Sequence, residues 1–254
     1  MYLSPKNGGI AMLIQGSSIT VMYKKIDGIK KAYYNNEEIL KDYFNEATVL
    51  PVPDDAPVEI PRIIIKTLHE HAQLNISPIA STFEVYYNDG YERNWNTCSE
   101  YIIARMAKVF EFLNILTNNS YEYVGLVTNI LYDEVNQGGT QKISNTLLNA
   151  CEIRDIYDIN IKYTFVEKNN MYVNIMLQNA RLFRDGIECN EAGALNSSEQ
   201  VAESIGCIID INDRYGFNNI KDYKSNSNNL NELIACMSDI INNKLSTLIE
   251  KGMY

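Results

Sequence analysis

Residues 157–178 read Tyr-Asp-Ile-Asn-Ile-Lys-Tyr-Thr-Phe-Val-Glu-Lys-Asn-Asn-Met-Tyr-Val-Asn-Ile-Met-Leu-Gln. Over 157–165 and again over 171–178, aromatic and aliphatic residues alternate with polar ones. A period of two puts successive side chains on opposite faces of a strand. Lys168-Asn-Asn170 lies between the two runs and predicts a turn. The stretch therefore predicts an antiparallel hairpin with one face buried and the other in contact with water.

Other strand-like runs lie on both sides of this hairpin. Residues 9–24 predict one broken strand, or a hairpin that turns at Gly16-Ser17. Residues 62–87 predict two strands that turn near His69. Simple apolar runs predict one further strand each over 121–133 and 201–212.

Helical spacing appears in four places. Thr97-Cys-Ser-Glu100 is a capping-box pattern, and the apolar residues that follow it at spacings of three and four predict a long helix up to Asn118. Asn229-Leu-Asn-Glu232 opens a second such helix, which ends at Gly252. Shorter helices are expected over 35–45 and after Thr140.

Three stretches predict irregular chain. Four prolines fall within residues 50–61, which predicts either a linker between domains or an extended connection within one domain. The polar residues 185–198 and the Asn- and Ser-rich residues 213–228 predict loops.

Taken together, these patterns predict an α+β fold with antiparallel sheets and two long amphipathic helices. The order of elements in the first half resembles that in the second, which suggests a pseudo-duplicated β-α-β-β-α unit. The expected units are residues 1–119 and 120–254, either as separate units or as one continuous domain.

Composition limits the function classes. Of the 254 residues, 46% are hydrophobic and 21% are charged, which is globular rather than disordered usage. The net charge of -10 makes nucleic-acid binding and docking on anionic lipid unfavourable. The sequence has no apolar run long enough to span a bilayer and no secretory pattern at its start, and its five cysteines are dispersed. We therefore expect a cytoplasmic protein.

Catalytic motifs are missing from the sequence. It contains no Gly-x-Ser-x-Gly elbow, no Gly-x-x-x-x-Gly-Lys phosphate loop and no Gly-x-Gly-x-x-Gly fingerprint. We predict no catalytic residue, no metal and no cofactor. Gly138-Gly139-Thr140 could present backbone N–H groups to an anion, but a plain turn and helix cap is the favoured interpretation.

His69-Glu70-His71 contains the chain's two histidines. On a strand, residues i and i+2 share a face, so both imidazoles could bind one divalent ion. Near a turn, the same histidines would be solvated, which is the interpretation we favour. His69, Glu70 and His71 remain candidate binding residues.

Two segments of the sequence resemble a known group of proteins. The segment Ala56-Pro-Val-Glu-Ile-Pro-Arg62 with the strands after it, and the ending Cys207-Ile-Ile-Asp-Ile-Asn212, long helix, Leu248-Ile-Glu250, are similar to a sporadically distributed family of uncharacterised prokaryotic and phage proteins. The resemblance implies an accessory protein of mobile gene neighbourhoods, connected with defence or counter-defence. It places Arg62 and Asp210 at recurring positions and makes them candidate binding residues.

The leading functional hypothesis is a non-enzymatic interaction or inhibitor module that binds another protein. The 18 tyrosines, against 7 Phe and 1 Trp, suit a recognition surface, although the codon bias of an AT-rich genome is the favoured explanation. The first alternative is a small-ligand or nucleotide-binding protein with a pocket between the two units. The second is a metal-dependent hydrolase that uses the His-Glu-His segment.

Overall fold

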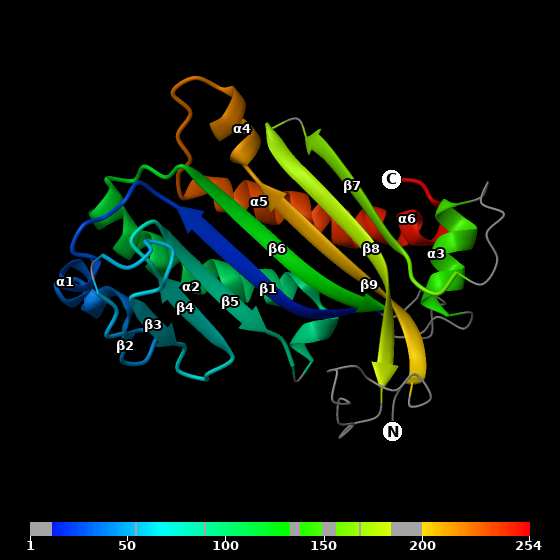
Figure 1. Cartoon of the computed structure of the whole chain (residues 1–254), viewed down its shortest axis with the longest axis horizontal. Helices are drawn as coiled ribbons and strands as arrows, with labels where there is room; N and C mark the ends of the chain where they lie inside the picture. The colour runs from blue at the N-terminus through cyan, green and yellow to red at the C-terminus, as the bar shows by residue number, and fades with distance from the viewer. Residues whose placement is uncertain are drawn as a thin grey trace.

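The computed structural model describes residues 12–53, 55–88, 90–132, 138–148, 156–167, 169–183 and 200–254. Within these residues, nine strands form one antiparallel sheet in the order β2-β3-β4-β5-β1-β6-β9-β8-β7 (Figure 1). The mixed α+β class with an antiparallel sheet is therefore confirmed. The strands are β1 (Met12–Met22), β2 (Thr48–Val49), β3 (Ile63–Lys66), β4 (Ala72–Ile76), β5 (Ala80–Tyr86), β6 (Tyr123–Tyr132), β7 (Asn160–Glu167), β8 (Met171–Phe183) and β9 (Gln200–Asn212).

Helices pack against one face of this sheet. The helix α2 and the run α5-η4-α6 lie on the same side of the strands (Figure 1). Their apolar residues and those of the strands form one buried cluster. The helical elements are α1 (Ile29–Tyr34), η1 (Glu37–Leu40), η2 (Tyr91–Arg93), α2 (Trp95–Thr117), α3 (Gly139–Leu147), α4 (Arg214–Asn219), α5 (Asn228–Asp239), η4 (Ile240–Lys244) and α6 (Leu245–Lys251).

Alternation along each strand determines which side chains reach the helices. In β6, Val124, Leu126 and Ile130 are buried, whereas Gly125 and Val127 between them are half-buried on the other face. Burial of the apolar set removes it from water and holds the helices on that side. The predicted hairpin around Lys168 is present as β7 and β8, with Tyr163 opposite Ile175.

The two halves of the chain meet in the middle of the sheet. Strand β1 pairs with β6 from Met12–Tyr132 to Met22–Tyr123, and with β5 on its other side. Of the two alternatives for this region, the hairpin at Gly16-Ser17 is wrong and the single interrupted strand is correct, because β1 runs from Met12 to Met22 with a bulge next to Gly16. A Cβ on Gly16 would lie 2.7 Å from the Val85 carbonyl oxygen, so this glycine serves close strand approach.

Three strands, not two, occupy residues 62–87. Strands β4 and β5 are separated by a tight turn in which the Ser77 hydroxyl accepts hydrogen bonds from the N–H groups of Ile79 and Ala80. Pro78 lies inside that turn and therefore does not interrupt a strand. The helix expected over residues 35–45 is displaced as well: α1 ends at Tyr34, and a short 3-10 turn, η1, follows it.

The two helical runs begin at residues other than the predicted capping boxes, and the second is interrupted. The first begins at Trp95, because the Asn94 side chain accepts hydrogen bonds from the N–H groups of Asn96 and Thr97. The second begins at Asn228 and has no side-chain cap at Ser227. A π-helical turn, η4, separates α5 from α6, so this run is not one regular α-helix.

The predicted loop over 213–228 contains the short helix α4. Tyr172 packs edge-on against Tyr215 at 5.2 Å, and Tyr123 lies 6.0 Å from Phe217. The loop predicted over 185–198 lies outside the described residues. Among the helices that the structure describes, none is both long and apolar enough to cross a membrane.

A buried carboxylate fixes the junction between the sheet and this segment. Asp213 is fully buried, and its two oxygens accept hydrogen bonds from Val124 N at 2.6 Å, Asn229 Nδ2 at 2.6 Å and Tyr223 Oη at 2.9 Å, and from Ser225 Oγ. Burial and the Asp213 charge both raise the pKa of Tyr223, so that hydroxyl remains a proton donor. A buried charge is tolerated when several donors compensate it.

Replacing Asp213 by Asn tests that role. We expect Asp213→Asn to lower the free energy of unfolding by about 3 kcal/mol, because the amide loses the charge and turns a donor toward other donors. Asp222→Asn is the matched control: Asp222 is exposed, and its change should stay within about 0.5 kcal/mol. Urea unfolding measures the free energy of unfolding of both variants, which can be compared with wild type if the dependence on urea concentration (the m value) is the same. Equal effects at the two positions would contradict the role assigned to Asp213.

Candidate functional site

One face of the sheet is not covered by the long helices. We call it the open face and define it by the outward-facing residues of the central strands. No other described helix lies over it, apart from α4 at the Tyr123 and Tyr172 end (Figure 1). Its central residues are Gly16, Ser18, Thr20, Gln73, Asn75, Thr82, Glu84, Gly125, Val127, Asn129, Asn174, Met176, Ile208, Asp210 and Asn212.

The strand register places two carboxylates in one row across this face. Glu84 lies opposite Ser18, Ser18 lies opposite Val127, and Val127 lies opposite Asp210. Three strand spacings separate the two carboxylates, which is about 14 Å. Paired-carboxylate hydrolysis needs a separation of roughly 5–10 Å, so this row is not built for that chemistry.

Carboxamides hold each of these carboxylates. Glu84 Oε2 accepts hydrogen bonds from Gln73 Nε2 at 3.1 Å and from Asn75 Nδ2 at 3.3 Å. Asp210 accepts them from Asn174 Nδ2 at 3.1 Å and from Asn212 Nδ2 at 2.9 Å. The open face is therefore preorganised, and its two acids are hydrogen-bonded to neutral groups rather than to bases.

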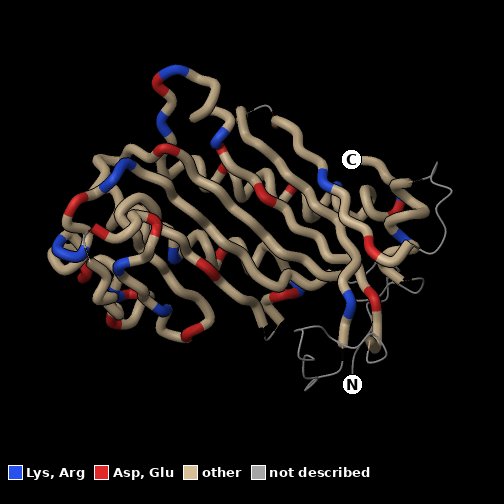
Figure 2. Tube along the Cα trace, viewed as in Figure 1, with Lys and Arg blue, Asp and Glu red and all other residues tan. Residues whose placement is uncertain are grey.

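Charge on the open face nearly cancels. Lys66 and Lys162 lie toward its two sides and oppose the charges of Glu84 and Asp210. Figure 2 shows most of the charged residues around the rim, while the strands that cross the middle are largely uncharged. The acidic excess of the whole chain thus lies mainly outside this surface.

The structure places Arg62 in a supporting position. Its side chain is buried and donates hydrogen bonds to the carbonyl oxygens of Ile60 at 2.7 Å, Ala56 at 3.0 Å and Pro57 at 3.3 Å. Its backbone N–H bonds to Ile76 O, and its carbonyl accepts from Leu50 N. Arg62 therefore fastens the proline-rich segment to the sheet. That segment is an extended connection between β2 and β3, which pair with each other.

His69, Glu70 and His71 lie in the exposed turn between β3 and β4, not on a strand. Glu70 has a φ of 57° and lies 3.7 Å from Lys66 Nζ. Within the described part of the chain, no group of three or more His, Cys, Asp or Glu side chains comes together to hold a metal. The metal-hydrolase alternative thus lacks its further ligands among these residues.

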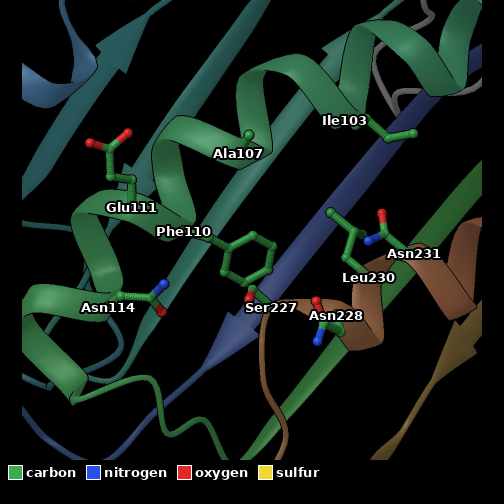
Figure 3. Close-up of a pocket in the computed structure, with 9 residues that line it drawn as sticks. All are labelled: Ile103, Ala107, Phe110, Glu111, Asn114, Ser227, Asn228, Leu230 and Asn231. Carbon is green, nitrogen blue, oxygen red and sulfur yellow. The ribbon is translucent and has the colours of Figure 1, made fainter.

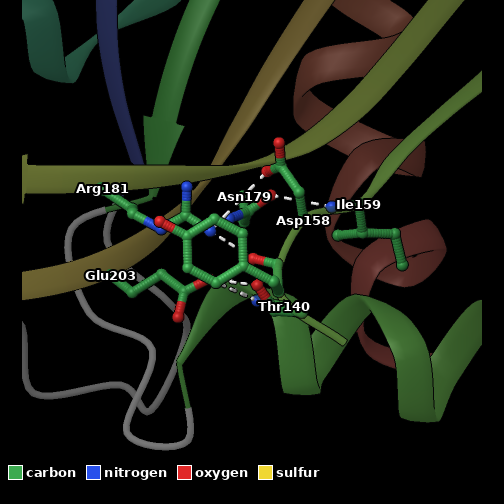
Figure 4. A network of polar contacts seen from close by, with 7 residues as sticks. Thr140, Asp158, Ile159, Asn179, Arg181 and Glu203 are labelled. Carbon is green, nitrogen blue, oxygen red and sulfur yellow. Dashed lines mark hydrogen bonds and ion pairs between the residues drawn. The ribbon is translucent and has the colours of Figure 1, made fainter. Parts of the chain in front are cut away.

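The N-terminus of α3 is already occupied by a carboxylate of the protein. Glu203 on β9 accepts hydrogen bonds from the Thr140 N–H, at 3.0 Å, and from the Thr140 hydroxyl (Figure 4). A Cβ on Gly139 would lie 1.9 Å from the Ser204 carbonyl oxygen, so glycine is required there. The cap interpretation of Gly138-Gly139-Thr140 is confirmed, although Glu203 supplies the capping group.

A second polar group lies beside this cap. Arg181 lies 3.8 Å from Asp158 and stacks over the Tyr157 ring, with Cζ 4.0 Å from its centroid (Figure 4). Asn179 Oδ1 accepts a hydrogen bond from Ile159 N at 3.0 Å. These contacts anchor the chain as it enters β7.

A groove of about 370 Å³ lies between α2 and α5, where the ligand-binding alternative would place its pocket (Figure 3). Phe110 and Leu230 are buried and form its apolar floor. Glu111, Asn114 and Asn231 line it as well. Its lining contains no basic side chain, so the groove offers little to an anionic ligand.

Sequence reasoning found Asp210 but missed Glu84 and the carboxamides around both acids. The outward positions of β4 and β8 alternate with buried aliphatic residues, which is a detectable signal. Comparison with protein-family models and with curated proteins finds no match for this chain.

The described cysteines provide a test of the non-catalytic interpretation. Burial raises the pKa of Cys98 and of Cys207 to about 12, and that of Cys236 to about 11. At pH 8, the first two should be thiolates in about one molecule in ten thousand. We expect Cys98 and Cys207 to react with a thiol reagent at least about 100-fold more slowly in the folded protein than after unfolding in guanidinium. Mass spectrometry of labelled peptides would measure this, and labelling of folded Cys207 within minutes would contradict it.

Proposed function

We propose that this protein is a non-enzymatic interaction module whose open face binds a folded partner protein. The observation that carries the proposal is a broad sheet surface with nearly balanced charge, on which carboxamides already donate hydrogen bonds to both carboxylates and the Thr20 and Thr82 hydroxyls bond to each other. Such groups lose less on desolvation than unpaired ones, because their bonds persist in the complex.

The size of the open face supports this function. The open face spans the six strands β4, β5, β1, β6, β9 and β8, which at about 4.8 Å a strand gives a width of roughly 29 Å, and the seven residues from Gly16 to Met22 add a height of about 20 Å. The resulting area of roughly 600 Å² lies at the lower end of what each partner contributes to a standard protein–protein interface.

Composition supports the same partner class. Val127, Met176 and Ile208 lie among carboxamides and hydroxyls, and charged residues are few. Interface cores are depleted in charge and enriched in Met and aromatic residues. Tyr123 and Tyr172 extend the surface at the α4 end. A polyanion would instead require a basic stripe, and the two lysines of this face are matched by two acids.

We also infer that the two halves are a pseudo-duplicated pair, each ending in a long amphipathic helical run. Outward from the centre, the strand order is β1-β5-β4-β3 on one side and β6-β9-β8-β7 on the other. Glu84 on β5 and Asp210 on β9 occupy equivalent places in these two series. A duplication would supply the open face with two similar acids, each hydrogen-bonded to carboxamides.

Arginine substitution on the open face tests the proposed function. We expect Val127→Arg and Ile208→Arg to weaken partner binding by at least about tenfold, because each places an unmatched charge in the centre of the interface. Ile103→Arg is the matched control, because Ile103 is an apolar residue of α2 with 42% of its surface exposed, away from the open face. Circular dichroism would verify that all three variants fold.

The measurement is affinity capture from an extract of the native host, treated with nuclease and compared across the variants. The proposal requires a partner that wild type and Ile103→Arg retain and both open-face variants lose. Equal retention by all variants would contradict it, and so would binding that disappears on nuclease treatment.

A further inference from the structure

A small cavity separate from the open face lies in the first half of the chain. It measures about 250 Å³ and lies between the end of β5, the β3–β4 turn and the start of α2. Tyr87, Tyr101 and Arg105 line its inner part, while His69, His71 and Tyr91 lie toward the turn and η2. The cavity therefore lies between the His-Glu-His segment and helix α2.

Two buried donors in this cavity, Tyr101 Oη and Arg105 Nε, have no hydrogen-bond partner among the described residues. Tyr87 Oη lies beside the Ser17 hydroxyl, which is also bonded to the Thr128 hydroxyl at 3.1 Å. Ser17 can accept from Thr128 and donate to Tyr87, which leaves the Tyr87 proton for a further acceptor. Burial raises the pKa of Tyr87, so this hydroxyl stays protonated. Buried polar groups normally have partners, so the two orphaned donors require an acceptor.

Arg105 brings a positive charge to the same place. Its Cζ lies 3.7 Å from the centroid of the Tyr101 ring and 4.8 Å from that of Tyr43. No Asp or Glu is among the described residues that line the cavity, so its lining offers this guanidinium no counter-ion. Stacking fixes the guanidinium plane but does not neutralise its charge.

Aromatic rings surround the entrance. Tyr91 meets Tyr101 edge-on, with centroids 6.2 Å apart and an angle of 84° between the rings. Tyr91 is 44% exposed, so its ring surface is available to a planar group. Such a surface favours a flat ligand over an extended one.

We propose that this cavity binds a small organic anion that carries a planar ring. Its carboxylate or phosphate group accepts hydrogen bonds from Arg105 Nε and from the hydroxyls of Tyr87 and Tyr101. Its ring packs against Tyr91. The cavity volume restricts the ligand to about the size of an aromatic acid or a mononucleotide.

Calorimetric titration of the full chain tests this proposal with two probes, adenosine monophosphate and 4-hydroxybenzoate. Binding of either probe below about 1 mM supports the class, and the stronger of the two tells phosphate from carboxylate. Adenosine without phosphate, and inorganic phosphate without a ring, should bind at least about tenfold more weakly than the better probe. Failure of both probes to bind would overturn the proposal.

Variants separate a binding role from a structural one. Arg105→Gln should abolish binding of the better probe, and Tyr87→Phe and Tyr101→Phe should each weaken it about tenfold. Without ligand, Tyr101→Phe should unfold at the same or a higher temperature than wild type, because it removes an unpaired buried hydroxyl. Tyr172→Phe on the open face is the matched control and should leave binding unchanged. A lowered unfolding temperature of ligand-free Tyr101→Phe, together with unaltered probe binding, would instead assign the hydroxyl a structural role and overturn the proposal.

Discussion

The pairing of β1 with β6 is the constraint on which the rest of the structure depends. It joins strands about a hundred residues apart in the chain and merges the strand series of the two halves into one sheet. The hydroxyls of Ser17 on β1 and Thr128 on β6 bond to each other at 3.1 Å beneath the helices, while Gly16 allows the close approach of β5 on the other side of β1. Once this register is set, Glu84 and Asp210 fall into one row, and the apolar residues of both halves contribute to one core.

Sequence patterns predicted much of this fold where periodicity was strong. The strands β7 and β8 follow a period of two over residues 157–178, β9 was predicted from an apolar run, and the stripes of α2 and of the C-terminal helical run follow helical spacing. The failures occurred where one residue type serves several structures. Gly16 suggested a turn but allows a bulge, and Pro78 looked like an interruption but lies in a turn. Thr97 and Glu100 match a capping box, yet Asn94 lies three residues earlier and caps the helix first.

The candidate sites were harder to predict, because they depend on register and on contacts between distant residues. Asp210 was recognised on its strand, but its partnership with Asn174 and the matching position of Glu84 follow only from the pairing of strands. Arg105 lies in a helix that was predicted from its apolar residues alone. Its position in the cavity depends on where α2 lies relative to the end of β5, which the sequence does not show. His69 and His71 were candidate binding residues that we expected to be solvated near a turn, and the structure places them in an exposed turn beside a cavity lined by tyrosines and an arginine.

Hydrogen exchange of the backbone amides tests the central pairing most directly. If β1 and β6 join the two halves, their amides in the Ser17–Val21 and Val124–Thr128 stretches should be the slowest to exchange and should exchange at the same rate, through global unfolding. The outer strand β7 should exchange faster, since its residues are largely exposed. Separate exchange of β1 and β6, with one half opening while the other remains protected, would contradict the account.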